Sequence, residues 1–98
     1  MEIELSELED MFHKKLALVE DSYDQEDLEI MEQCLVDVAS LMHIADAEEK
    51  SKELDIIKAT LANVEDKVRL RIAKIVEESV SQLIGFGIKT VLTAIRPI

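Results

Sequence analysis

The chain has 98 residues and a formal net charge of −11, and 48% of its residues are hydrophobic but only 3% aromatic. This length allows one domain with one small core, and a core of aliphatic side chains favours helices over a sandwich or barrel. Because Cys34 is the single cysteine, an intramolecular disulfide and a cysteine-based metal knuckle are excluded.

A first helix is predicted over residues 6 to 20. Ser6 and Glu9 have the spacing of a capping box at the start of an apolar series, which consists of Leu8, Phe12, Leu16 and Val19. Met11 and Leu18 widen this apolar stripe. The short polar stretch that follows predicts a tight connection to an antiparallel second helix.

The second helix is predicted from the most regular periodicity in the chain. Ser22 or Asp24 is expected to cap its N-terminus. Its apolar residues are spaced alternately three and four apart, which is the spacing of helix-on-helix packing: Leu28, Met31, Leu35, Val38, Met42 and Ala45. We expect an acidic helical hairpin over 1–48, followed by a turn near residues 46 to 51.

The second half of the chain, residues 49–98, is predicted to form one long helix with an apolar, basic C-terminal end. Apolar residues continue at helical spacing from about residue 51 to 84. Two breaks are alternatives: one near 63, where Asn63 and Asp66 could cap a new helix, and one near 85, where Gly85 and Gly87 stand. The alternation of apolar and basic residues over 67–72 has no second strand to pair with, so a helix is favoured there.

The sequence thus predicts an all-α fold over a single domain, 1–98, with an N-terminal helical hairpin and a long C-terminal helix in an oligomeric helical bundle. The long helix outruns its hairpin partners and leaves apolar residues without cover in their own chain. A second copy of the chain is the simplest cover, so we expect a homo-oligomer, most simply a dimer. The expected interface consists of Val68, Ile72, Ile75, Val76, Val80, Leu83, Ile84, Ile88, Val91 and Ile95.

Charge is distributed unevenly along the chain: residues 1 to 32 carry −10, whereas residues 67 to 98 carry +4. Free nucleic acid is therefore an unsuitable partner, because phosphate binding needs clustered cations in a positive field. The opposite charges favour a hairpin helix lying beside a basic patch, in the same chain or a neighbouring one. That patch consists of Lys67, Arg69, Arg71 and Lys74.

No group of residues has the pattern of a catalytic or metal site, so no cofactor is expected. Asp10 and His13 have the spacing of a diiron ligand pair, but the matching second pair is missing, since His43 has Ser40 at that offset. The acidic repeat at Glu26, Glu29 and Glu32 resembles that of helical nucleotide pyrophosphohydrolases, which also need a later acidic pair that this chain lacks. These residues are interpreted as solvated helix faces, and Cys34 as a core residue.

The sequence predicts a non-catalytic interaction protein, such as an adaptor, scaffold, chaperone or regulator. The alternative is an acidic inhibitor that imitates nucleic acid in a basic site of another protein. An acidic start to the chain and the lack of a long apolar run predict a cytoplasmic protein with no secretory signal and no transmembrane segment. The amphipathic C-terminal end leaves contact with a membrane surface as a lesser alternative to self-association.

Overall fold

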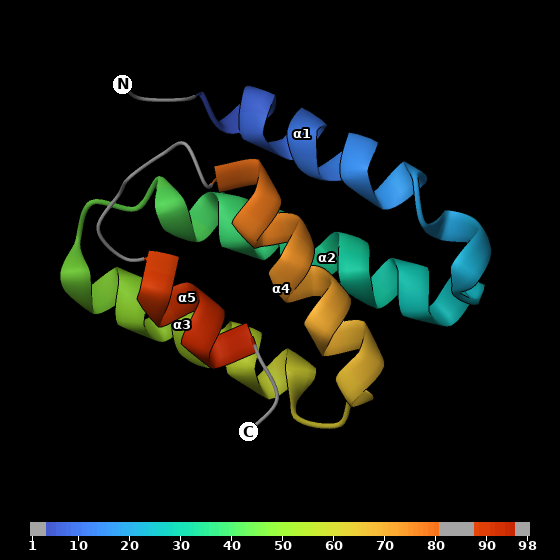
Figure 1. The fold of residues 1–98 in the computed structure, drawn as a ribbon. Coiled ribbons are helices and arrows are strands. Elements are labelled where there is room, and N and C mark those ends of the chain that lie inside the picture. Colours follow the sequence, from blue (N-terminus) through green and yellow to red (C-terminus); the bar gives the residue numbers. More distant parts are fainter. Residues whose placement is uncertain (1–3, 81–87, 96–98) are drawn as a thin grey trace.

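The computed structural model describes residues 4–80 and 88–95, and every regular element in these ranges is a helix (Figure 1). The elements are α1 (Leu5–Ala17), a single 3-10 turn η1 (Glu20–Ser22), α2 (Gln25–Met42), α3 (Ala47–Leu61), α4 (Asp66–Val80) and α5 (Ile88–Ile95). The all-α prediction is confirmed. Predictions for Leu83, Ile84, Gly85 and Gly87 fall outside the described residues.

Helices α1 and α2 form an antiparallel hairpin joined through η1 (Figure 1). The predicted N-cap of α2 is confirmed, because an Asp24 carboxylate oxygen accepts a hydrogen bond from the Asp27 N–H at 2.8 Å. Ser6 is not the N-cap of α1: the helix begins at Leu5, after Glu4, which caps it without a side-chain hydrogen bond. The first helix is also shorter than expected, since it ends at Ala17.

The turn between α2 and α3 falls slightly earlier than predicted. Helix α2 ends at Met42, and Asp46 caps α3 by accepting hydrogen bonds from the N–H groups of Glu48 (2.8 Å) and Glu49 (3.2 Å). The polar stretch that follows Asp46 is therefore the exposed first part of α3.

The predicted long helix from residue 51 to 84 is not formed. Helix α3 ends at Leu61, and α4 begins at Asp66, so residues 62 to 65 form the break between them. The carbonyl of Glu65 accepts the first hydrogen bonds of the new helix, from the N–H groups of Val68 and Arg69. The break lies at the alternative position near Asn63. It lets the chain reverse, so that α4 contacts both α1 and α2.

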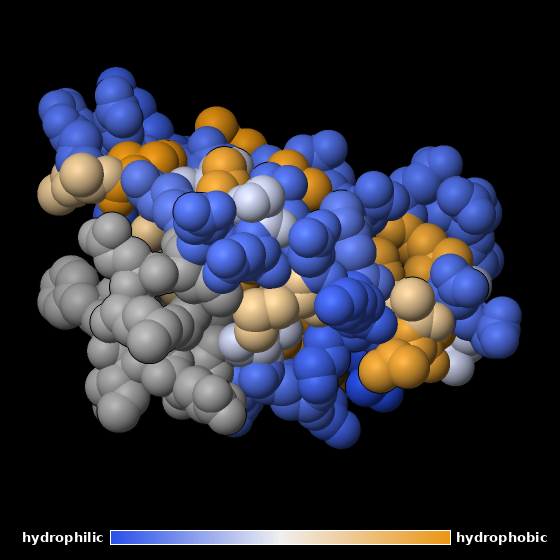
Figure 2. Space-filling view, turned by 90° about the horizontal axis from the view of Figure 1, so that it is seen from above, coloured by the Kyte–Doolittle hydropathy of each residue, from blue (hydrophilic) through white to orange (hydrophobic). Residues whose placement is uncertain are grey.

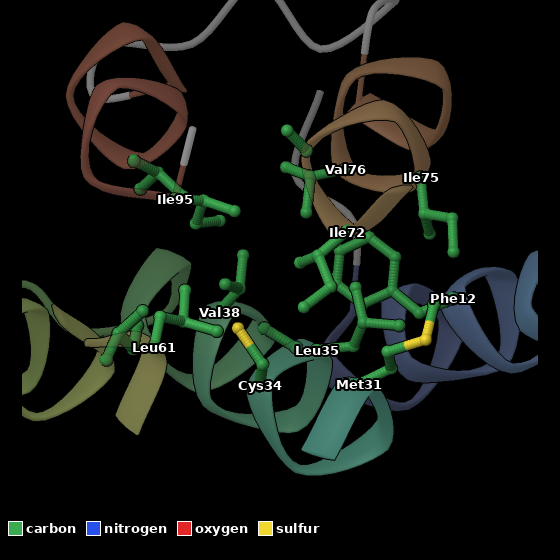
Figure 3. Close-up of a cluster of buried hydrophobic side chains, with 14 of the residues drawn as sticks. Phe12, Met31, Cys34, Leu35, Val38, Leu61, Ile72, Ile75, Val76 and Ile95 are labelled. Atoms are coloured by element: carbon green, nitrogen blue, oxygen red, sulfur yellow. The ribbon is translucent and has the colours of Figure 1, made fainter. Parts of the chain in front are cut away.

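The core is assembled by α4 packing on the hairpin. Phe12 of α1, Met31 and Leu35 of α2, and Ile72 and Ile75 of α4 meet in one buried cluster (Figure 3). The terminal helix α5 packs on α3 and α4 (Figure 1). Two of its side chains, Val91 and Ile95, join the buried cluster. The apolar residues of α4 and α5 that were expected to be covered by a second copy are thus covered by helices of the same chain.

Candidate functional site

The residues predicted as an oligomer interface lie mostly inside a single chain. Six of them are buried in its core: Val68, Ile72, Ile75, Val76, Val91 and Ile95. The premise that this stretch lacks intrachain cover is wrong for these six, because the break at residues 62 to 65 folds α4 back onto α1 and α2. Val80 and Ile88 lie in helices but their side chains are not described, and Leu83 and Ile84 lie outside the described residues.

The four predicted bases do not form one open patch. Arg69 is half-buried, and its Nε donates a hydrogen bond to the carbonyl oxygen of Ile95 at 2.8 Å. Arg71 is also half-buried, and its Nε donates to the hydroxyl of Tyr23 across a longer distance, 3.5 Å. Lys67 and Lys74 are exposed. The arginines thus stabilise contacts between elements, and only the two lysines face solvent.

Helix α4, which carries the four predicted bases, contacts α1 and α2 of the hairpin. The described ion pairs give little support to opposite charge as the reason for this contact. An ion pair between α1 and α4 joins Lys15 to Glu78 at 3.4 Å. Its base comes from the acidic segment of residues 1 to 32, and its acid comes from the basic segment of residues 67 to 98. Lys67 lies 3.6 Å from Glu65 in its own part of the chain. Apolar packing therefore accounts for the position of α4 better than opposite charge.

Carboxylates dominate the described surface. No described Asp or Glu is buried, and most are exposed. Figure 2 shows a face that is largely hydrophilic, with hydrophobic side chains set between the polar ones. This arrangement creates a negative field at the surface.

The two histidines lie in different environments. Nε2 of His13 on α1 is 3.7 Å from a carboxylate oxygen of Glu32 on α2, and both side chains are exposed. Nδ1 of His43, the C-cap of α2, is 2.9 Å from the carbonyl oxygen of Ala39. Within residues 4–80 and 88–95, no three His, Cys, Asp or Glu side chains are grouped as a metal ion would require. The acids Glu26, Glu29 and Glu32 are exposed on α2.

Cys34 lies in the core at 1% exposure. Burial, together with the nearby carboxylate of Asp37, raises the pKa of its thiol to about 12, against a smaller lowering by the Arg69 guanidinium. Because only the thiolate is a good nucleophile, this thiol is unreactive near neutral pH while the core is closed. The structure therefore agrees with Cys34 as a core residue.

Several large aliphatic side chains face solvent, which the apolar spacing of the sequence did not predict. Leu18 was assigned to the apolar stripe of the first helix, but it lies just after α1 and is 81% exposed. Ile56 on α3 and Leu70 on α4 are each 53% exposed. For Leu70, the signal was present in the sequence: it interrupts the spacing of Val68, Ile72 and Ile75 and stands between basic residues.

No family model, no curated protein and no solved structure matches this chain. None of the described helices has both the length and the apolar character needed to cross a membrane.

Proposed function

We propose that the protein is a non-catalytic interaction protein, an adaptor, scaffold, chaperone or regulator that binds other proteins through its helical surface. The observation that carries the proposal is Leu18, which is 81% exposed in the turn after α1 and is followed by the exposed carboxylates Glu20 and Asp21. An aliphatic side chain among carboxylates suits a partner with an apolar pocket bordered by lysine or arginine.

Partner capture with a matched pair of leucine variants tests this proposal. Tagged wild type, Leu18→Ser and Leu5→Ser are used as baits; Leu5 stands at the other end of α1 and is 38% exposed. A partner retained by wild type and by Leu5→Ser but lost with Leu18→Ser is the expected result. Identical partners for all three baits would contradict the assignment to Leu18.

The acidic inhibitor that imitates nucleic acid is the second candidate. Its support is the exposed acids of α1, η1 and α2, which belong to the segment of residues 1 to 32 that carries −10. Binding to a basic DNA-binding protein is compared at low and high salt. A contact through many carboxylates weakens steeply as salt rises, whereas an apolar contact through Leu18 changes little.

Self-association also belongs to the proposal, through a surface other than the buried residues of α4 and α5. Leu70 is exposed, and the exposed lysines Lys67 and Lys74 stand three before it and four after it on the same helix face. This stripe is complementary to the acidic surface of a second copy. Light scattering coupled to size exclusion should give a mass above 11.1 kDa, and Leu70→Asp should shift it toward 11.1 kDa. A wild-type mass of 11.1 kDa at micromolar concentration would exclude this contact.

A further inference from the structure

We propose that two copies of the chain pair through the outward face of α4, with the two helices antiparallel and Leu70 of each copy beside the two-fold axis between them. This inference rests on the self-association included in the proposed function, and it names the surface of the second copy that Leu70 contacts. In the pair, Lys74 of each copy lies opposite Asp66 of the other. The exposed Leu18 takes no part in this contact.

Helix α4 has one buried side and one exposed side. It contacts α1, α2 and α5, and the apolar residues of its buried side belong to the core: Val68, Ile72, Ala73, Ile75 and Val76. Three residues spaced four apart, Asp66, Leu70 and Lys74, are all exposed. Residues at this spacing follow one another along a single row of the helix surface, and we call these three the outward row.

The two charged residues of the outward row are available to a second chain. The neighbouring Lys67 already lies 3.6 Å from a carboxylate oxygen of Glu65. Neither Asp66 nor Lys74 takes part in an ion pair within residues 4–80 and 88–95. The exposed leucine between them is therefore flanked by one acid and one base that the described part of the chain leaves unpaired.

The order of residues along the outward row makes the row complementary to itself. Leu70 stands at the centre, with the acid four residues before it and the base four residues after it. A two-fold axis that reverses the helix direction at Leu70 brings Lys74 opposite Asp66 of the other copy, twice in one contact. A parallel pair would place Lys74 opposite Lys74 and Asp66 opposite Asp66, and such like-charge contacts are unfavourable. The charges therefore select the antiparallel arrangement.

Helix packing permits this contact. Rows of residues spaced four apart form the ridges of the commonest helix packing, in which the two axes lie about 8–10 Å apart. At this separation the two Leu70 side chains exclude water from each other, and the aliphatic stems of the Lys74 side chains extend the cover. An apolar centre with charged residues at its edge is the usual arrangement of a protein interface. Because the apolar area is small, the pair is expected to form and dissociate reversibly.

Disulfide trapping tests the position of Leu70 beside the axis. The background variant Cys34→Ala removes the single native thiol. In this background, Leu70→Cys is compared with Ile56→Cys and Leu18→Cys, whose positions are also exposed. In a glutathione redox buffer, Leu70→Cys should form a disulfide-linked dimer about tenfold faster than the two controls, because only residues that face each other across a close helix pair are within disulfide reach. Equal rates for the three cysteines would overturn the proposal.

Charge exchange tests the pairing of Lys74 with Asp66. In a dimer of Asp66→Lys alone or of Lys74→Glu alone, two like-charge contacts replace the two attractive ones, so the dissociation constant should rise about tenfold. When the two variants are mixed in equal amounts, every charge meets its opposite, and association should return to the level of wild type. Analytical ultracentrifugation measures the dissociation constants, and circular dichroism verifies that each variant keeps its helices.

Failure of this contact is distinguishable from failure of self-association itself. A wild-type mass above 11.1 kDa, with no preferred trapping at position 70 and no gain on mixing, would show that the copies associate through another surface. The antiparallel contact of α4 would then be wrong while self-association stands. A wild-type mass of 11.1 kDa at micromolar concentration would rule out both.

Discussion

The pKa of the Cys34 thiol shows how burial in the core changes the acidity of a single side chain. Burial raises its pKa to about 12 from 9.0, so the folded protein holds the thiol proton more tightly than the unfolded chain does. The contribution of this thiol to the free energy of unfolding is fully present below pH 9 and is lost as the pH rises toward 12. The reason is that the thiol ionises at a lower pH in the unfolded chain than in the folded protein.

We therefore predict a pH-dependent difference between wild type and Cys34→Ala. Between pH 9 and pH 10, the unfolding free energy of the wild type should fall relative to that of the variant by about 1 kcal/mol, because the unfolded thiol ionises in this range while the folded one does not. Urea unfolding of both proteins at pH 8, 9 and 10 measures this difference. A difference that stays constant over this range would show that the thiol is not buried as described.

Ser79 is a buried polar residue whose hydroxyl has no hydrogen-bond partner among the described residues. An unpaired buried hydroxyl costs about 1–3 kcal/mol. We predict that Ser79→Ala raises the unfolding free energy by about 1 kcal/mol or more. Ser6→Ala, at an exposed position of α1, is the control for helix propensity. Equal effects of the two substitutions in urea unfolding would show that the Ser79 hydroxyl carries no such cost.

At the scale of the elements, local sequence predicts the helices better than it predicts where they end. The spacing of Met31, Leu35 and Val38 places these residues in the core, and all three are buried. Leu18 has the same apolar character, but α1 ends at Ala17, so its side chain faces solvent. Periodicity fixes which residues can share a face, while the end of a helix depends on the turn that follows it.

The N-cap of α3 offers a test at this scale. The Asp46 carboxylate accepts hydrogen bonds from two backbone N–H groups of the first turn, and loss of such a cap costs about 1 kcal/mol. We predict that Asp46→Ala lowers the unfolding free energy by about that amount. Asp55→Ala, an exposed substitution inside the same helix, should leave it unchanged or slightly raise it. If the two variants are equally stable, Asp46 does not act as a cap.

For the whole molecule, the decisive feature is the reversal between α3 and α4. Apolar spacing continues across residues 62 to 65, so the sequence pattern alone favoured an uninterrupted helix. In the structure, breaking the helix brings Ile72 and Ile75 against Phe12 and α2, which buries surface that a straight helix leaves exposed. This gain depends on contacts between distant parts of the chain, and local patterns do not report it. For the same reason, six of the ten residues of the predicted interface are buried in the core of their own chain.

The claim that α4 belongs to the core of its own chain is tested most directly at Ile75, which is 3% exposed. An unpaired carboxylate there is far costlier than a cavity. Light scattering and thermal unfolding by circular dichroism are measured on Ile75→Asp and on Leu70→Asp, its exposed counterpart on the same helix. We predict that Ile75→Asp loses cooperative unfolding while Leu70→Asp keeps the helix content of the wild type. A folded Ile75→Asp protein with a lower mass than the wild type would contradict the account, because Ile75 would then lie between copies.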